Sequence, residues 1–202
     1  MSVANAQTSR LQPTEPPFEC CQITHHYEVL DDASTTHRAE DTYWLRARSW
    51  FRFFEHRYRW TGSGVERPPR VLPSSDDVHS AYYRIHGPLI RDGENRIFLI
   101  DMARDVAPDE DVTVRFEQDL IDHHETFEPR LRKTIRTPID KLILQVLLPP
   151  ALRANVRATV RDLVTEAPAA APVALAPEGD EGVFRYEIDS PVVGQRYAIE
   201  WT

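Results

Sequence analysis

Cysteine and glycine are scarce in this 202-residue chain, and each shortage excludes a class of protein. The two cysteines, Cys20 and Cys21, are adjacent in the sequence, a placement that rarely forms a relaxed disulfide and cannot staple a fold. The seven glycines are dispersed, and the chain contains no P-loop, no G-x-G-x-x-G and no G-x-S-x-G. We therefore expect no disulfide framework, no cofactor and no enzymatic activity.

Long apolar runs are also missing. No stretch approaches the roughly 18 apolar residues of a membrane-spanning helix, and the polar N-terminus lacks the apolar core of a secretory signal. Together with the cysteine usage, this predicts a soluble cytoplasmic protein without membrane association. The net charge of -8 argues against wholesale binding of nucleic acid, because phosphate neutralisation would need a local basic face.

The composition is otherwise that of a folded globular protein, with 41% hydrophobic and 28% charged residues. Residues 1–18 are rich in Pro, Thr, Ser and Gln, which predicts a disordered tail. The sixteen prolines disfavour long helices, although a spacing near 3.6 makes residues 40–58 the best helical candidate. We expect residues 19–202 to form a single domain.

From residue 20 onwards the dominant period of apolar residues is two, which indicates strands with one buried and one solvated face. The pattern is strict at Val112, Val114 and Phe116, and it returns in residues 156–160 and 197–201. His25 interrupts it in the segment CQITHHYEVL. The sequence therefore predicts an all-β, two-sheet antiparallel sandwich of about nine or ten strands, with few or no long helices.

Two further runs, residues 96–101 and 141–148, are nearly continuous in apolar residues, as strands covered on both sides would be. Asp92 and Gly93 lie between two extended runs, which predicts a hairpin, because the turn needs positive φ.

The stretch SWFRFFEHRYRWTGSG, residues 49–64, combines aromatic residues with arginines. Residues 46–60 could bind single-stranded nucleic acid through this mixture, but the arginines alternate with apolar residues as in a strand with one buried face. Charge is also segregated, since residues 105–128 are acidic and residues 130–141 basic. Such runs are usually solvated faces, but they also suit a partner surface. The candidate partner-binding residues are Arg57, Arg59, Trp60, Arg130, Arg132 and Lys133.

Several histidines suggest a metal site, but their spacing does not provide one. The segment IDHHETFE contains His123 and His124, but neighbouring histidines in a strand point to opposite faces and cannot grip one ion. A site would need one of them joined by a residue such as His79 or His86 from another strand. We predict no metal site, and surface histidines are the preferred interpretation.

The C-terminal phrase PVVGQRYAIEWT, with its G-x-x-Y-x-I-x-W pattern, resembles the closing strand of uncharacterised β-rich C-terminal modules of actinobacterial regulatory and signalling proteins. The preceding LILQVLLP followed by alternating strands is similar to those modules in order. The resemblance implies a sensing or docking module, with no catalytic residues to carry over. No second effector domain accompanies it in these 202 residues.

The sequence as a whole favours a non-catalytic, cytosolic protein-interaction or regulatory module that binds another protein. An exposed sheet edge would also allow two copies to pair as a homodimer. The alternative, from a different class, is a small-molecule or metal-binding sensor that uses the sandwich interior or His123 and His124. Nucleic-acid binding through residues 46–60 is the third and weakest hypothesis.

Overall fold

The computed structural model describes residues 16–33, 35–124 and 126–202, and in these the chain is built almost entirely of strands. Six of them form the largest sheet, in the order β12-β9-β1-β2-β7-β4. Their bounds are β1 Phe18–Val29, β2 Thr36–Ala47, β4 Arg70–Leu72, β7 Asp111–Ile121, β9 Lys141–Leu147 and β12 Val183–Asp189. The expected all-β fold is confirmed.

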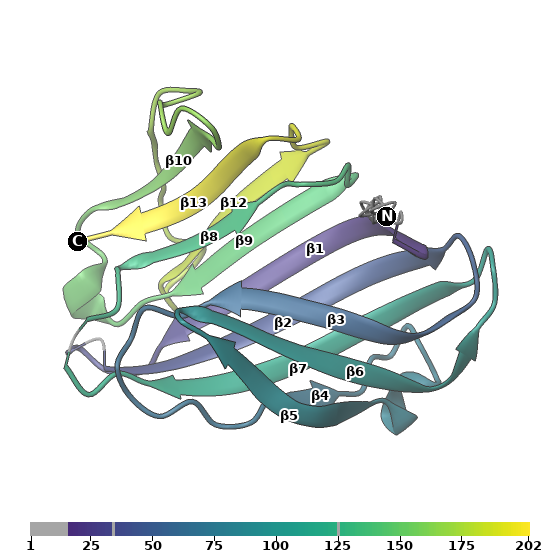
Figure 1. Cartoon of the computed structure of the whole chain (residues 1–202). Helices are drawn as coiled ribbons and strands as arrows, with labels where there is room; N and C mark the ends of the chain where they lie inside the picture. Colours follow the sequence, from purple (N-terminus) through teal and green to yellow (C-terminus); the bar gives the residue numbers. More distant parts are fainter. Residues whose placement is uncertain (1–15, 34, 125) are drawn as a thin grey trace, which may run out of the picture.

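Two smaller sheets lie side by side against the large one and form the second layer of the sandwich (Figure 1). One has the order β3-β6-β5 and the other β11-β10-β13-β8. Their bounds are β3 Phe51–Arg59, β5 Arg84–Asp92, β6 Asn95–Val106, β8 Arg130–Thr134, β10 Val156–Asp162, β11 Val173–Ala174 and β13 Gln195–Trp201. The sandwich therefore has a divided second layer, in which β3 and β8 are edge strands.

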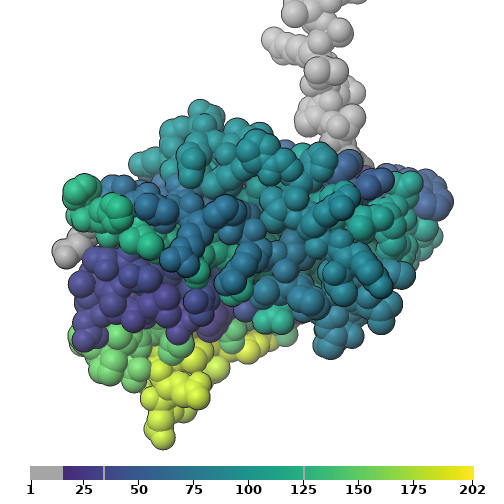
Figure 2. Space-filling view, turned by 90° about the horizontal axis from the view of Figure 1, so that it is seen from below, coloured from purple at the N-terminus to yellow at the C-terminus, as the bar shows by residue number. Residues whose placement is uncertain are grey.

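Figure 2 shows residues from the middle of the chain, blue to teal, on one side of the molecule, and N-terminal residues, purple, together with residues nearer the C-terminus, green to yellow, on the other. Pairing is antiparallel throughout, except that β1 and β9 run parallel, with Ile23 opposite Leu142. The hairpin predicted at Asp92 and Gly93 joins β5 to β6, and Gly93 has the expected positive φ of 58°.

One continuous hydrophobic core fills the space between the layers. Aromatic contacts connect both small sheets to the large one: Phe98 of β6 packs on Phe116 of β7, and Trp201 of β13 approaches Tyr27 of β1. Burying this apolar surface is the main favourable term of the fold. The alternation predicted along β7, β10 and β13 is confirmed, because the predicted inward residues are all buried, although Thr113, Thr159 and Ala198 of the opposite face are buried too.

The helix predicted at residues 40–58 is wrong. This segment forms the end of β2 and most of β3, and the connection between them passes from one sheet to another. Its period is two, because Tyr43 and Leu45 are buried whereas Trp44 is 42% exposed. The only helical elements of the described residues are two short 3-10 turns, η1 Ser80–Tyr82 and η2 Pro150–Leu152.

Most of the tail predicted at residues 1–18 lies outside the described residues. At its end the prediction runs too far, because β1 already begins at Phe18, whose ring packs against Phe51 and Phe54. None of the helices in the described residues is long and apolar enough to cross a membrane.

Candidate functional site

A groove follows the boundary between the two small sheets. Its walls come from the edge strands β3 and β8, and its floor comes from β1, β2 and β7 of the large sheet. It contains a pocket of about 500 Å³ and an adjoining pocket of about 230 Å³. Both pockets are lined by His56, Arg57, Lys133, Thr134 and Arg136, so they form one continuous site. The larger volume is in the range of small-molecule binding sites.

Cationic side chains from both walls line the larger pocket: Arg57, Arg59, Arg130, Arg132, Lys133, Arg136 and Arg196. Four of them have a carboxylate partner at the rim, namely Arg57 with Glu55, Arg59 with Glu94, Arg130 with Glu128 and Arg196 with Glu166. The positive charges of this cluster affect one another's pKa. Burial, and then the nearby charges of Arg130, Arg59 and Arg196, lower the pKa of Arg132.

Arg132 and Arg136 are the arginines of the described chain with neither an ion pair nor a hydrogen bond. Lys133, between them, has no carboxylate within ion-pair distance. Elsewhere in the described residues the arginines pair with carboxylates or, like Arg153 and Arg161, donate to backbone carbonyls. The cations that lack an anion are thus concentrated in one wall of the groove.

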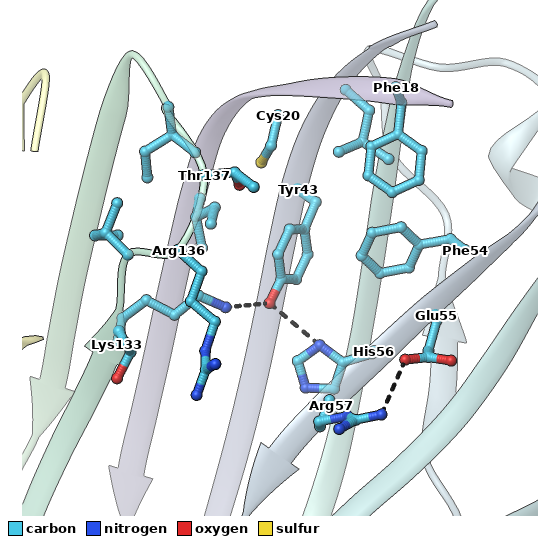
Figure 3. Close-up of a pocket in the computed structure, with 15 residues that line it drawn as sticks. Phe18, Cys20, Tyr43, Phe54, Glu55, His56, Arg57, Lys133, Arg136 and Thr137 are labelled. Atoms are coloured by element: carbon cyan, nitrogen blue, oxygen red, sulfur yellow. Dashed lines mark hydrogen bonds and ion pairs between the residues drawn. The ribbon is translucent and has the colours of Figure 1, made fainter. Parts of the chain in front are cut away.

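Beneath this wall, a chain of polar groups crosses the floor of the groove (Figure 3). Lys133 Nζ donates a hydrogen bond of 3.0 Å to Tyr43 Oη, which lies 3.1 Å from His56 Nδ1. Burial lowers the pKa of Lys133 to about 8. Burial, and then the charge of Lys133, lower the pKa of His56 as well, so its imidazole is neutral at physiological pH. The base of the pocket therefore carries a lysine amine whose charge changes with pH near 8.

A buried dyad, His25 and Asp41, completes the floor. His25 Nδ1 contacts Asp41 Oδ1, and Asp41 Oδ2 lies 3.8 Å from His56 Nε2. Burial, followed by the charges of Lys133 and His56, lowers the pKa of His25. The other ring nitrogen, His25 Nε2, is buried and has no hydrogen-bond partner within the described chain.

Three further polar atoms of the pocket residues are buried and lack a hydrogen-bond partner in the described chain: Tyr27 Oη, Trp60 Nε1 and Arg130 Nε. Buried polar atoms are rarely left unsatisfied, and each such case requires an explanation. With His25 Nε2, they form a layer of buried, unsatisfied polar atoms directly beneath the pocket.

All six residues predicted for partner binding line this one pocket. Arg57, Arg59 and Trp60 come from β3 and the residue after it, and Arg130, Arg132 and Lys133 from β8. Trp60 is 2% exposed, however, so it belongs to the core beneath the pocket and offers no outer surface. The parity interpretation of residues 57–60 holds, because both arginines are exposed and Trp60 is buried.

Sequence reasoning missed the floor of the groove. His25 does not interrupt the alternation of β1 but follows it, since Ile23, His25 and Tyr27 are all buried. Asp41 and His56 are likewise polar residues at buried positions of alternating strands. A polar residue in phase with the apolar face of a strand is the signal that could have identified them, because burying such a group needs compensation.

The other sites considered from sequence are not assembled. His123 and His124 are exposed in the segment after β7, and His79 and His86 are exposed elsewhere. Within the described residues no group of three or more His, Cys, Asp or Glu side chains could hold a metal ion.

The arginines of residues 46–60 do not form one surface either. Arg46 and Arg48 pair with Asp111 and Glu19 at the end of the large sheet, whereas Arg52 pairs with Asp101 in a small one. Many carboxylates of the acidic run also form ion pairs with arginines. Asp119 pairs with an arginine of β2 and with one that precedes β4, and Glu117 pairs with an arginine of β4.

Comparison with known proteins gives only distant structural likenesses. No protein-family model and no curated protein matches the chain. An M1 zinc metallopeptidase from Deinococcus radiodurans is similar at a TM-score of 0.46 and 10% identity, over 91% of this chain and 42% of that one. A putative protease from Parabacteroides distasonis is similar at a TM-score of 0.48 and 9% identity, over 92% of this chain and 40% of that one. The chain spans less than half the length of these proteins.

Proposed function

We propose that this protein is a binding module that takes up a small organic anion, bearing a carboxylate or phosphate group, in the groove between β3 and β8. The observation that carries the proposal is the position of Arg132, Lys133 and Arg136, which line the pocket without an anionic partner in the described chain. Arg132 and Lys133 are partly buried, and removing charged groups from water without pairing them is costly, so an anionic ligand would offset that cost, while Arg136 offers an exposed guanidinium beside them.

The shape and polarity of the groove support a small ligand. A volume of about 500 Å³ suits a molecule of metabolite size, and the aromatic rings of Tyr27, Phe116 and Phe127 provide apolar walls. This is the sensor-type function weighed from the sequence, placed in the groove and not at His123 and His124.

A protein partner is the second candidate, and the edge strands favour it. Both β3 and β8 border the groove as the last strands of their sheets, so an extended acidic segment could add to either edge by main-chain hydrogen bonds. Its carboxylates would then face Arg132 and Arg136. This candidate retains the docking role first expected from the sequence, including the pairing of two copies.

Isothermal titration calorimetry of the full chain with citrate, 2-oxoglutarate, inorganic phosphate and an acidic peptide tests the proposal. We expect a small anion to bind, and R132A and R136A each to weaken it about tenfold or more, since a hydrogen bond to a charged group contributes about 1.5–3 kcal/mol. R157A is the matched control, because Arg157 is an exposed arginine of β10, an inner strand of the same small sheet, paired with Glu200 of β13.

Three results are informative. Binding of a small anion that R157A preserves and R132A and R136A weaken supports the proposal. Binding of the acidic peptide alone transfers support to the protein partner. Binding that all three variants weaken equally, or no binding of any probe at low salt, contradicts both, because a local cluster of cations would then have no specific role.

A further inference from the structure

The chain has only two lysines, and they lie in opposite environments. Lys141, on β9, pairs with Glu187 and Asp189 of the neighbouring β12. Lys133 lines both pockets of the groove, and its ammonium meets the hydroxyl and the ring face of Tyr43 instead of a carboxylate. Within the described residues, one of the two lysine amines thus has no carboxylate partner, and it borders a cavity large enough for a ligand.

An amine attacks a carbonyl carbon only in its neutral form. A lysine of ordinary pKa, near 10.4, is less than about 1% neutral at pH 8, whereas a group of pKa near 8 is about half neutral. Burial brings Lys133 into this second class, because it lowers the pKa to about 8. The hydrogen bond to Tyr43 Oη holds the nitrogen at a fixed position on the groove floor.

Groups able to move protons surround this nitrogen. Tyr43 Oη connects Lys133 to the neutral imidazole of His56, and His25 is a further lining residue of the same pocket. Arg136 extends beside Lys133 from the same wall, with its guanidinium unpaired (Figure 3). An amine, proton carriers and an anion-binding arginine are therefore assembled around one space.

We propose that Lys133 captures the carbonyl group of an anionic aldehyde or 2-oxo acid as an imine, while Arg136 binds the carboxylate or phosphate of the same molecule. The inference rests on the proposed anion-binding function and names the ligand class. The ligand is thereby held covalently and reversibly.

The step balances without an oxidant or reductant. The lone pair of Lys133 Nζ attacks the carbonyl carbon and forms the C–N bond, and the carbonyl oxygen takes up a proton to become a hydroxyl. The nitrogen loses a proton, and the hydroxyl then leaves as water once it is protonated again, which gives the C=N bond. The Tyr43–His56 pair, hydrogen-bonded to Lys133 Nζ through Tyr43 Oη, is positioned to accept and return these protons.

Pyridoxal 5′-phosphate, an aldehyde with a phosphate group, is a suitable probe with borohydride as the trap. Hydride adds to the imine carbon and a proton to the nitrogen, which makes the adduct permanent. Peptide mapping by mass spectrometry then separates Lys133, Lys141 and the amino group of residue 1. We expect the full chain at pH 8 to take up the label at Lys133 about tenfold or more faster than at Lys141.

Variants and analogues make the result specific. K133R keeps the positive charge and should abolish the adduct, whereas K141R should leave it unchanged. R136A should slow labelling by pyridoxal 5′-phosphate about tenfold but hardly change labelling by pyridoxal, which has no phosphate. Pyridoxine 5′-phosphate, an alcohol that cannot form an imine, reports anion binding alone by calorimetry.

The outcomes separate the two proposals. Label concentrated on Lys133 and dependent on Arg136 supports the inference. Label spread equally over the three amines, or confined to Lys141 and residue 1, while pyridoxine 5′-phosphate still binds in an Arg136-dependent manner, overturns the imine but not the anion site. Absence of both labelling at Lys133 and binding of the alcohol overturns both.

Discussion

Lys133 Nζ donates a hydrogen bond of 3.0 Å to Tyr43 Oη and lies 5.1 Å from the centre of the same ring. The Lys133 ammonium, which the fold has partly removed from water, thus contacts the ring and the hydroxyl of Tyr43. Residues kept for binding often cost stability, because the surroundings that suit a ligand do not suit the free protein.

K133M should therefore stabilise the protein near neutral pH. The pKa of Lys133 is lowered to about 8, below its value in the unfolded chain, so the folded state penalises the charged form by about 3 kcal/mol before the lost Tyr43 hydrogen bond is subtracted. We expect a net gain of about 1–2 kcal/mol in the free energy of unfolding by urea denaturation at pH 7. A loss of stability would show that Lys133 is a structural cation.

The pH dependence of that gain has a fixed sign. The penalty is complete below pH 8, where both states are protonated, and it disappears as the unfolded lysine loses its proton near pH 10.4. The difference between K133M and the wild type should therefore shrink between pH 8 and 10.5. K141M, which replaces a lysine paired with Glu187, provides the control.

Arg96 and Glu66 form a buried ion pair, with Nε 2.6 Å from Oε1 and 2.7 Å from Oε2. R96M should destabilise the protein by about 3–5 kcal/mol, because it leaves a buried carboxylate with only the exposed Arg91, 3.7 Å away, as counter-ion. The double variant E66M/R96M should be much less affected, since it removes both charges. Single-variant costs that simply add in the double variant, measured by urea unfolding, would refute this coupling.

Asp122 anchors the segments on either side of the end of β7. It accepts hydrogen bonds from Ser63 N at 3.0 Å, Ser63 Oγ at 2.9 Å and Phe127 N at 2.6 Å. D122N replaces an acceptor oxygen with a donor, so we expect a loss of about 2 kcal/mol or more in the free energy of unfolding at pH 7. D32N, at an exposed carboxylate, should change stability little.

The contribution of Asp122 to the free energy of unfolding should disappear at acidic pH. Burial alone would raise the pKa of this carboxyl, but the hydrogen bonds from Ser63 and Phe127 outweigh burial and hold the pKa below its usual value. Its stabilisation is therefore complete above about pH 4 and is lost as the pH falls towards the lowered value. The gap between wild type and D122N should narrow below pH 4, and a gap independent of pH would contradict this origin.

Cys20 lines the smaller pocket but should be unreactive. Burial raises the pKa of its thiol to about 12, so at pH 8 the thiolate fraction falls roughly a thousandfold below that of a free cysteine. Burial raises the pKa of Cys21 as well. Alkylation by iodoacetamide should be slow in the native protein and fast in urea, and rapid native labelling would show that the pocket opens readily.

The local structure was largely predictable from the sequence, and the exception has a physical reason. Alternation identified β7, β10 and β13, and Asp92-Gly93 identified the β5–β6 hairpin. The helix prediction for residues 40–58 failed because bulky residues recur there at spacings that fit both periods, and one of them, Trp44, is exposed. The parallel pairing of β1 with β9 joins segments far apart in the chain and leaves no local signal.

The candidate site was only half visible. Arg57 and Arg132 were selected as members of two separate basic segments, and nothing in the sequence indicated that β3 and β8 line one groove. The buried polar floor, formed by His25, Asp41 and His56, was missed because a histidine in an alternating strand resembles a break in the pattern until its face is known.

The sequence by itself determined the class of fold, because a period of two with frequent prolines permits little besides strands with one buried face. It also determined which cations would be available, since these depend on residue type alone. Only the tertiary structure decided how the second layer divides into two sheets and which edge strands face each other across the groove. That choice depends on packing between strands far apart in the chain, and it alone places Lys133 beside Tyr43 and leaves Arg132 and Arg136 without a carboxylate.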